Sequence, residues 1–140
     1  MIYWEHNPWT NKNKPKNISI DFFYKSNSPT IVKKRFLDNV NKNKVLGVYK
    51  INDDILTKKE DKLFYNILKK MTPKYDLVIV SDYGHGLITK KIAKHLCKKS
   101  KYLALNAQSN ASNVGYHTIQ KYKNVDCVVM NETELRHELR

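Results

Sequence analysis

The chain has 140 residues, of which 41% are hydrophobic and 28% are charged. That length fits one domain with a buried core, and the composition is globular rather than disordered or collagen-like. No apolar run approaches the ~20 residues that a membrane-spanning helix needs, and the N-terminus lacks the basic and apolar segments of a secretory signal. We therefore expect a cytoplasmic protein with no membrane partner.

The formal net charge of +13 comes from 26 basic residues against 13 acidic ones. Clustered lysine and arginine neutralise phosphates, so this charge raises the question of a nucleic acid or another polyanion as partner. Arginine, the usual residue for bidentate contacts with phosphates and bases, occurs only at positions 35, 136 and 140. The lysines are spread along most of the chain. The charge therefore favours solvated lysines and predicts no specific nucleic-acid partner.

The N-terminal part of the chain, residues 1–28, is polar and aperiodic. We interpret it as an irregular lead-in, broken by prolines, with one short strand at residues 18–22. Two runs rich in strand-forming residues then follow, at 31–37 and 45–51, with a turn-prone segment between them. This pattern predicts a β-hairpin near residues 31–51.

The hydrophobic period changes after the hairpin. Thr57 and Glu60 have the spacing of a capping box, and an apolar stripe of helical period follows them as far as Met71. Pro73 ends this predicted helix. The short apolar run at residues 77–80 predicts a strand that is buried on both faces.

Helices and strands alternate through the rest of the chain. This alternation predicts βαβ units, and hence an α/β fold with a mostly parallel sheet and right-handed crossovers. Cys97 and Cys127 lie in apolar settings and are interpreted as core residues. His95, on a lysine-rich helix, is assigned to the surface or a supporting role rather than to catalysis. The remaining predicted elements are a helix from Thr89 with Ile92, Ala93, Leu96 and Cys97 inward, a strand at 102–105, a helical stretch near 118–121, a strand at 127–130 and a helix from Glu132.

Polar or glycine-containing segments follow the three predicted buried strands. In open α/β sheets, ligands bind outside the carboxyl ends of the strands, so these segments converge on one edge where a cleft would form. The segment after the third strand is Asn131-Glu132-Thr133-Glu134. The candidate cleft residues after the first two strands are Asp82, Gly84, His85, Gly86, Asn106 and Gln108.

Each of these motifs also has a purely structural interpretation. Gly84 and Gly86 either let the backbone approach a phosphate or simply form a tight turn. Asn131 and Glu134 have the spacing of a capping box, yet an amide and a carboxylate at a helix terminus also suit a nucleotide phosphate and its Mg²⁺. The asparagines at 106–113 favour turns over contacts with substrate hydroxyls.

Three stretches of the chain resemble the ribokinase-like (PfkB) carbohydrate kinases, and within them the kinase domains of the heptose-7-phosphate kinase/ADP-heptose synthase type. The stretches are Pro29–Arg35, Asp76–Thr89 and the Asn131-x-x-Glu134 motif, and the resemblance covers about residues 29–140. It implies a three-layer fold that transfers the γ-phosphate of ATP to a hydroxyl of a sugar or sugar phosphate. A homodimer is implied for a full-length member.

The resemblance also implies roles for the candidate residues. ATP and Mg²⁺ would be the cofactors, with no direct metal ligand from this chain. Asp82, Gly84 and Gly86 would line the floor of the cleft. The nucleotide and Mg²⁺ site would consist of Asn131, Glu132, Thr133 and Glu134.

The sequence departs from the family pattern in several places. His85 stands where the heptose kinases usually have lysine, and Asn106-Ala107-Gln108 replaces their Asp-Pro-Lys. The Asp-x-x-Gly-x-Gly-Asp segment, which supplies the catalytic base and an anion hole, does not occur in the sequence, and neither does the glycine-rich sugar-binding segment. We therefore expect an incomplete, central part of a kinase domain that is inactive by itself, with its last strand at an unpaired edge. The alternatives are a non-catalytic nucleotide- or polyanion-binding module and an inactive remnant.

Overall fold

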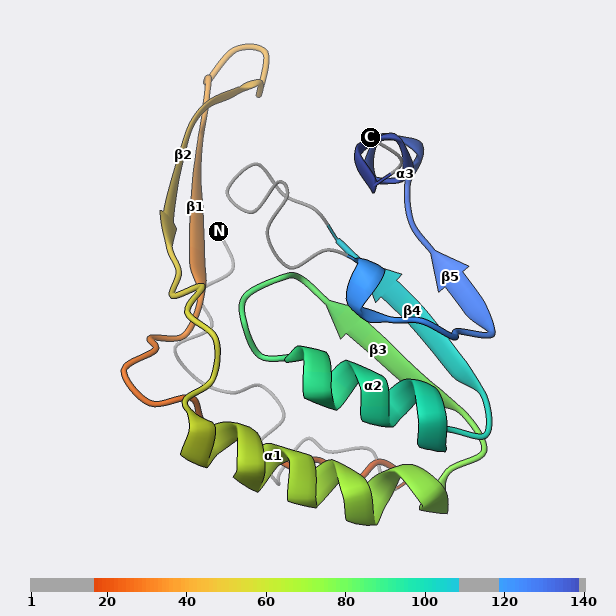
Figure 1. Ribbon diagram of the computed structural model, residues 1–140. Coiled ribbons are helices and arrows are strands. Elements are labelled where there is room, and N and C mark those ends of the chain that lie inside the picture. Colours follow the sequence, from red (N-terminus) through yellow and green to blue (C-terminus); the bar gives the residue numbers. More distant parts are fainter. Residues whose placement is uncertain (1–16, 109–118, 139–140) are drawn as a thin grey trace. The chain divides into compact units, whose positions relative to one another are not determined.

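The computed structural model describes residues 17–108 and 119–138 (Figure 1). The chain divides into two compact units, residues 1–50 and residues 51–140. The domain that we expected over residues 29–140 therefore spans the boundary between the units. Among the helices of the described ranges, none has the length and apolar character needed to cross a bilayer.

The first unit contains the predicted hairpin. Strands β1 (Val32–Leu37) and β2 (Lys44–Lys50) pair in antiparallel fashion, with one irregularity of register near the turn. The turn is closed by Asp38, whose carboxylate accepts a hydrogen bond from the backbone N–H of Asn41 at 2.5 Å. The prediction of a short strand at residues 18–22 was wrong, because this segment has no regular structure. It has no partner strand among the described residues, and a strand needs one to satisfy its backbone N–H and C=O groups.

The second unit has the strand–helix alternation that the sequence predicts. Its three strands are all parallel, and they lie in the order β3-β4-β5. The unit is therefore an α/β fold with a small parallel sheet. The antiparallel pair of the first unit is a separate sheet. In chain order, its elements are α1 (Lys58–Met71), η1 (Thr72–Lys74), β3 (Val78–Asp82), α2 (Lys90–Lys99), β4 (Leu103–Ala107), η2 (Ile119–Lys121), β5 (Cys127–Val129) and α3 (Glu132–Glu138).

The core of the second unit lies between α2 and one face of the sheet (Figure 1). The sheet contributes Val80, Leu103 and Leu105, which are 1–7% exposed. From α2 come Ile92 and Leu96, as the apolar stripe of this helix predicts, with Ala93 between them. Full burial of such a side chain stabilises the fold by about 1.5–3 kcal/mol.

The opposite face of the sheet is open within the described residues, so the prediction of a strand buried on both faces was wrong. Ile79 on β3 is 70% exposed and Val129 on β5 is 59% exposed. An apolar run of this length is typical of a strand covered on two sides, but α2 covers only one side here. Cys97 and Cys127 are half-buried rather than core residues. For Cys127 the register gives the reason, since it pairs through Ala104 with Ile79 and so shares the open face of the sheet.

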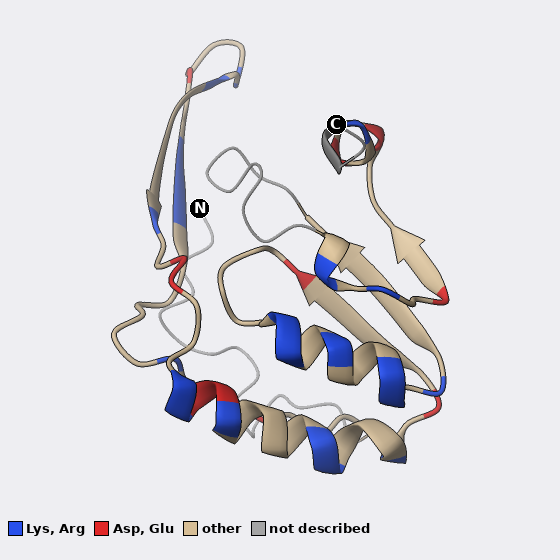
Figure 2. Ribbon diagram, viewed as in Figure 1, with Lys and Arg blue, Asp and Glu red and all other residues tan. Residues whose placement is uncertain are grey.

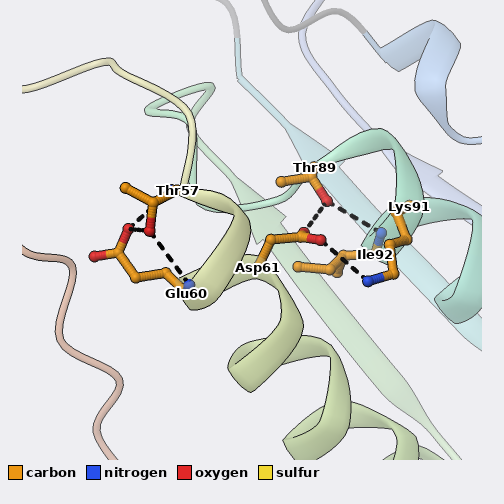
Figure 3. Close-up of polar contacts among 6 residues, drawn as sticks. All are labelled: Thr57, Glu60, Asp61, Thr89, Lys91 and Ile92. Atoms are coloured by element: carbon orange, nitrogen blue, oxygen red, sulfur yellow. Dashed lines mark hydrogen bonds and ion pairs between the residues drawn. The ribbon is translucent and has the colours of Figure 1, made fainter.

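Helix α1 forms an outer layer against α2. The predicted capping box is present: the Thr57 N–H donates to Glu60 Oε2 at 2.8 Å, and the Glu60 N–H donates to Thr57 Oγ1 at 3.3 Å. Asp61, in the first turn of α1, accepts hydrogen bonds from the Thr89 hydroxyl at 2.6 Å and from Lys91 Nζ at 3.2 Å. Figure 3 shows this contact, through which one carboxylate ties the N-termini of the two helices together.

His95 is buried between the helices, so of the two placements that the sequence left open, the surface was wrong. Its ring packs edge-on against Tyr65 of α1 with ring centroids 5.0 Å apart, and only 8% of the residue is exposed. Its Nε2 atom is buried without a hydrogen-bond partner in the described part of the chain. Burial lowers the pKa of His95 below its usual value of 6.5, and the positive charges of Lys99 and Lys69 lower it further, against a backbone hydrogen bond with Leu68.

This lowered pKa makes the stability of the protein depend on pH. The unfolded chain takes up a proton at His95 near pH 6.5, whereas the folded chain resists it, so the free energy of unfolding should fall as the pH drops below about 6.5. In the His95→Gln variant, the dependence on pH from 7.5 to 5.5 should be shallower. Urea denaturation of both proteins across this range tests the expectation. Parallel pH profiles would contradict it.

Candidate functional site

The carboxyl ends of the three parallel strands lie at one edge of the sheet, as the sequence predicts. The register pairs Asp82 with Ala107 and Asn106 with Val129. The backbone N–H of Gln108 donates to the Asp82 carbonyl at 2.9 Å, and the Asn106 amide donates to the Val129 carbonyl at 2.8 Å. The Gln108 hydrogen bond extends the pairing of β3 and β4 one residue beyond the end of β4. The Asn106 bond adds a side-chain contact at the last paired position of β4 and β5. The Gln108 side chain is exposed at this edge.

Asp82 is the centre of a buried polar network. Its side chain and that of Lys121 are 5% and 6% exposed, and Lys121 Nζ lies 2.6 Å from Asp82 Oδ2. The Tyr122 hydroxyl donates to the same oxygen at 2.7 Å, and the Gly84 N–H donates to Oδ1 at 3.0 Å. Burial and the nearby Asp82 charge raise the pKa of Tyr122 far above its usual value, so this phenol remains a donor. Both carboxylate oxygens are thus used within the chain, and Asp82 acts by positioning the loop that follows it.

Lys121 and Tyr122 are site residues that the sequence did not reveal. Lys121 is the last residue of η2 and Tyr122 follows it, and the turn is closed by a hydrogen bond from the Tyr122 N–H to the Ile119 carbonyl at 2.9 Å. Lys121 Nζ also donates to the Ile88 carbonyl at 2.9 Å. Lys121 is one of 26 basic residues, and only its burial distinguishes it from the others, so composition and spacing carried no signal for it.

The two glycines after β3 have a structural role within the chain. Gly84 and Gly86 have φ values of 70° and 76°, the left-handed region that favours glycine. A Cβ atom on Gly86 would overlap the carbonyl oxygen of Asp54, and the Gly86 carbonyl accepts a hydrogen bond from the Leu56 N–H at 3.3 Å. The close backbone approach that Gly86 permits is therefore to residues 53–56 of the same chain.

His85 lies between these glycines and is oriented by Asp53. His85 Nδ1 lies 2.7 Å from Asp53 Oδ1, and the two side chains are 11% and 35% exposed. A carboxylate at this distance fixes the orientation of an imidazole ring and which of its nitrogens carries a proton. Asp53 precedes the predicted helix by several residues, and no motif marked it as a partner of His85.

The Asn131 segment forms the capping box of α3. The Asn131 N–H donates to Glu134 Oε2 and the Glu134 N–H donates to Asn131 Oδ1, both at 2.9 Å. Glu134 is only 5% exposed. The capping bonds use one oxygen of each side chain and leave the Asn131 amide NH₂ and Glu134 Oε1 outside the box. Glu132 and Thr133 are exposed, and Glu132 forms an ion pair with Arg136 at 2.6 Å.

The strand-end edge therefore combines a rigid floor with polar groups of several kinds. The floor is the loop held by Asp82, and the polar groups include the imidazole of His85 and the amide and carboxylate of the α3 capping box. Within the described ranges, no three His, Cys, Asp or Glu side chains gather closely enough to hold a metal ion directly. Comparison of the chain with family models, curated proteins and solved structures gives no match.

Proposed function

We propose that this chain is part of an ATP-dependent carbohydrate kinase with the three-layer, ribokinase-like fold, and that its strand-end edge takes part in binding ATP and the sugar. The observation that supports this most directly is the parallel register. It aligns the ends of β3 and β4, and the ends of β4 and β5, at the edge where ligands of open α/β sheets bind. Two of the three stretches that carry the resemblance to these kinases reach this edge, one through β3 and the loop after it and the other after β5.

The α3 capping box fits the nucleotide end of such a site. Mg²⁺ prefers oxygen ligands and keeps several of its waters, and it binds kinases largely through the phosphates of ATP. Glu134 and Asn131 are suited to hold those waters and orient the phosphates. When bound, Mg²⁺ would neutralise charge on the transferring phosphate.

The β3 loop fits the sugar end. Asp82 and Gly86 hold the loop in one conformation, and Asp53 presents the His85 ring as a hydrogen-bonding group for a sugar or sugar-phosphate substrate. Transfer forms a bond between the sugar oxygen and the γ-phosphorus, breaks the bond from that phosphorus to ADP, and moves the hydroxyl proton to a base. The Asp-x-x-Gly-x-Gly-Asp segment that supplies this base in the family is absent from the 140 residues. We therefore expect binding without phosphate transfer by this chain alone.

Mg·ATP titration by calorimetry tests the nucleotide site. The Glu134→Gln variant keeps an oxygen for the capping bond but loses the negative charge, so it should bind Mg·ATP about tenfold more weakly. Thr57→Ala is the matched control, because it breaks a capping box of the same kind on α1 and should leave the affinity unchanged. The proposal fails if the unaltered chain does not bind Mg·ATP, or if Glu134→Gln binds it as tightly as the unaltered chain.

A further inference from the structure

A wide groove lies on the helical side of the second unit, away from the open face of the sheet. Its volume is about 1380 Å³, and its walls come from the start of α1, from α2 and from the segment that follows η2. We call it the lysine groove, because seven lysines line it and Asp61 is its one acidic side chain. Its basic character is concentrated on α2, which has five lysines and no acidic residue (Figure 2).

Most of the lysines that line the groove have no carboxylate partner in the described part of the chain. Lys91 pairs with Asp61 and the buried Lys121 pairs with Asp82. The other five lining lysines are exposed and form no ion pair within the described residues. Exposed cations in a concave surface raise the local concentration of anions and favour an anionic partner. These five are Lys58, Lys90, Lys94, Lys98 and Lys123.

The spacing of the α2 lysines suits an extended chain of carboxylates. Lys90, Lys94 and Lys98 are four residues apart, so they form one row along the helix. With a rise of 1.5 Å per residue, successive lysine positions in this row are about 6 Å apart along the helix axis. In an extended polypeptide, alternate side chains point to the same side and are about 6.6 Å apart. An extended acidic segment can therefore meet each lysine of the row in turn.

The apolar part of the lining favours a polypeptide over a nucleic acid. Ile55 is 64% exposed at the groove, and Ile88 and Cys97 are half-buried beside it. Single-stranded nucleic acids are bound by stacking on aromatic rings, and base edges are recognised mainly by arginine or amide side chains. No aromatic or arginine side chain lines the groove among the described residues. A phosphate backbone gains nothing from exposed isoleucine, whereas aliphatic side chains of a peptide bury apolar area there.

We propose that the lysine groove binds an extended acidic segment of a partner protein, in which carboxylate and aliphatic side chains alternate along the chain. The carboxylates contact the lysine row of α2 together with Lys58 and Lys123, and the aliphatic side chains contact Ile55 and Ile88. This site is independent of the ATP site proposed above, because none of its contacts involves the α3 capping box.

Fluorescence anisotropy with the 140-residue chain tests this proposal. The probe is a labelled peptide of repeated Glu-Leu pairs, and the competitors are an oligoglutamate and an oligodeoxythymidylate of the same net charge. The triple variant Lys90→Gln/Lys94→Gln/Lys98→Gln removes the row. Its matched control, Lys59→Gln/Lys62→Gln/Lys70→Gln, removes three exposed lysines of α1 that do not line the groove. Ile55→Ser removes exposed apolar surface without loss of charge.

We expect the Glu-Leu peptide to bind more tightly than either competitor, and the α2 variant to weaken this binding by about tenfold while the α1 control changes it little. Ile55→Ser should abolish the preference for the leucine-containing peptide over oligoglutamate. If the two triple variants weaken binding equally, the effect is one of overall charge and the proposal is wrong. Tighter binding of the oligonucleotide would also overturn it, in favour of a nucleic-acid groove.

Discussion

Replacing Asp82 with asparagine is expected to lower the free energy of unfolding of the second unit by about 3–5 kcal/mol, because it leaves a buried lysine without its counter-charge. Lys121 is 6% exposed and its ammonium group lies 2.6 Å from the Asp82 carboxylate. The substitution also weakens the acceptor for the Tyr122 hydroxyl. Urea denaturation followed by far-UV circular dichroism measures the effect, since α1 and α2 dominate the helical signal.

The control for this prediction is Asp76→Asn. Asp76 also forms an ion pair with a lysine, Lys101, at 2.7 Å, but its side chain is 94% exposed, so we expect almost no change in the denaturation midpoint. In the double variant Asp82→Asn/Lys121→Met neither charge of this pair is left, and much of the lost stability should return. Equal effects of Asp82→Asn and Asp76→Asn would show that burial of the pair does not matter. Failure of the double variant to recover stability would assign the loss to the Tyr122 and Gly84 hydrogen bonds instead.

The Gly86→Ala substitution should destabilise the second unit by about 2–4 kcal/mol, from backbone strain and overpacking together. Alanine strains the backbone at a φ of 76°, and its methyl group would overlap the backbone carbonyl of Asp54. Neither problem is relieved by rotating a side chain, because the obstructing atoms belong to the main chain. The same denaturation measurement applies.

Gly47→Ala in the hairpin is the matched control. A Cβ atom there would lie 2.8 Å from the Tyr49 hydroxyl and 3.0 Å from Lys44 Cε, which are the far ends of flexible side chains. Those chains can move aside, so we expect a much smaller loss of stability. If Gly86→Ala is as harmless as Gly47→Ala, residues 53–56 do not pack on the β3 loop as the structure has them.

The features that the sequence predicted correctly are those that depend on neighbours along the chain. The capping box at Thr57, and one of the two interpretations left open for Asn131 and Glu134, follow from side chains three residues apart, and the buried side of α2 follows from its helical period. The hairpin follows from two strand-forming runs around a turn. In each case the interacting residues are close in sequence, so spacing alone was sufficient.

The missed features depend on residues that are distant in sequence. Tyr122 meets Asp82 across 40 positions, and His85 meets Asp53 across 32. The burial of His95 depends on Tyr65 of another helix. The open face of the sheet could not be predicted from residues 77–80, because their apolar character does not reveal how many faces are covered. These properties arise from packing between elements, which a local pattern does not encode.

The buried Asp82 network also bears on the order in which the chain can fold during synthesis. The ribosome releases β3 and its glycine turn well before it releases Lys121 and Tyr122, the groups that complete the surroundings of the Asp82 carboxylate. Until those residues emerge, the carboxylate retains its water shell, since burying it without a counter-charge is unfavourable. We therefore expect the turn after β3 to reach its final conformation late, once residues that lie beyond β4 have packed around the Asp82 carboxylate.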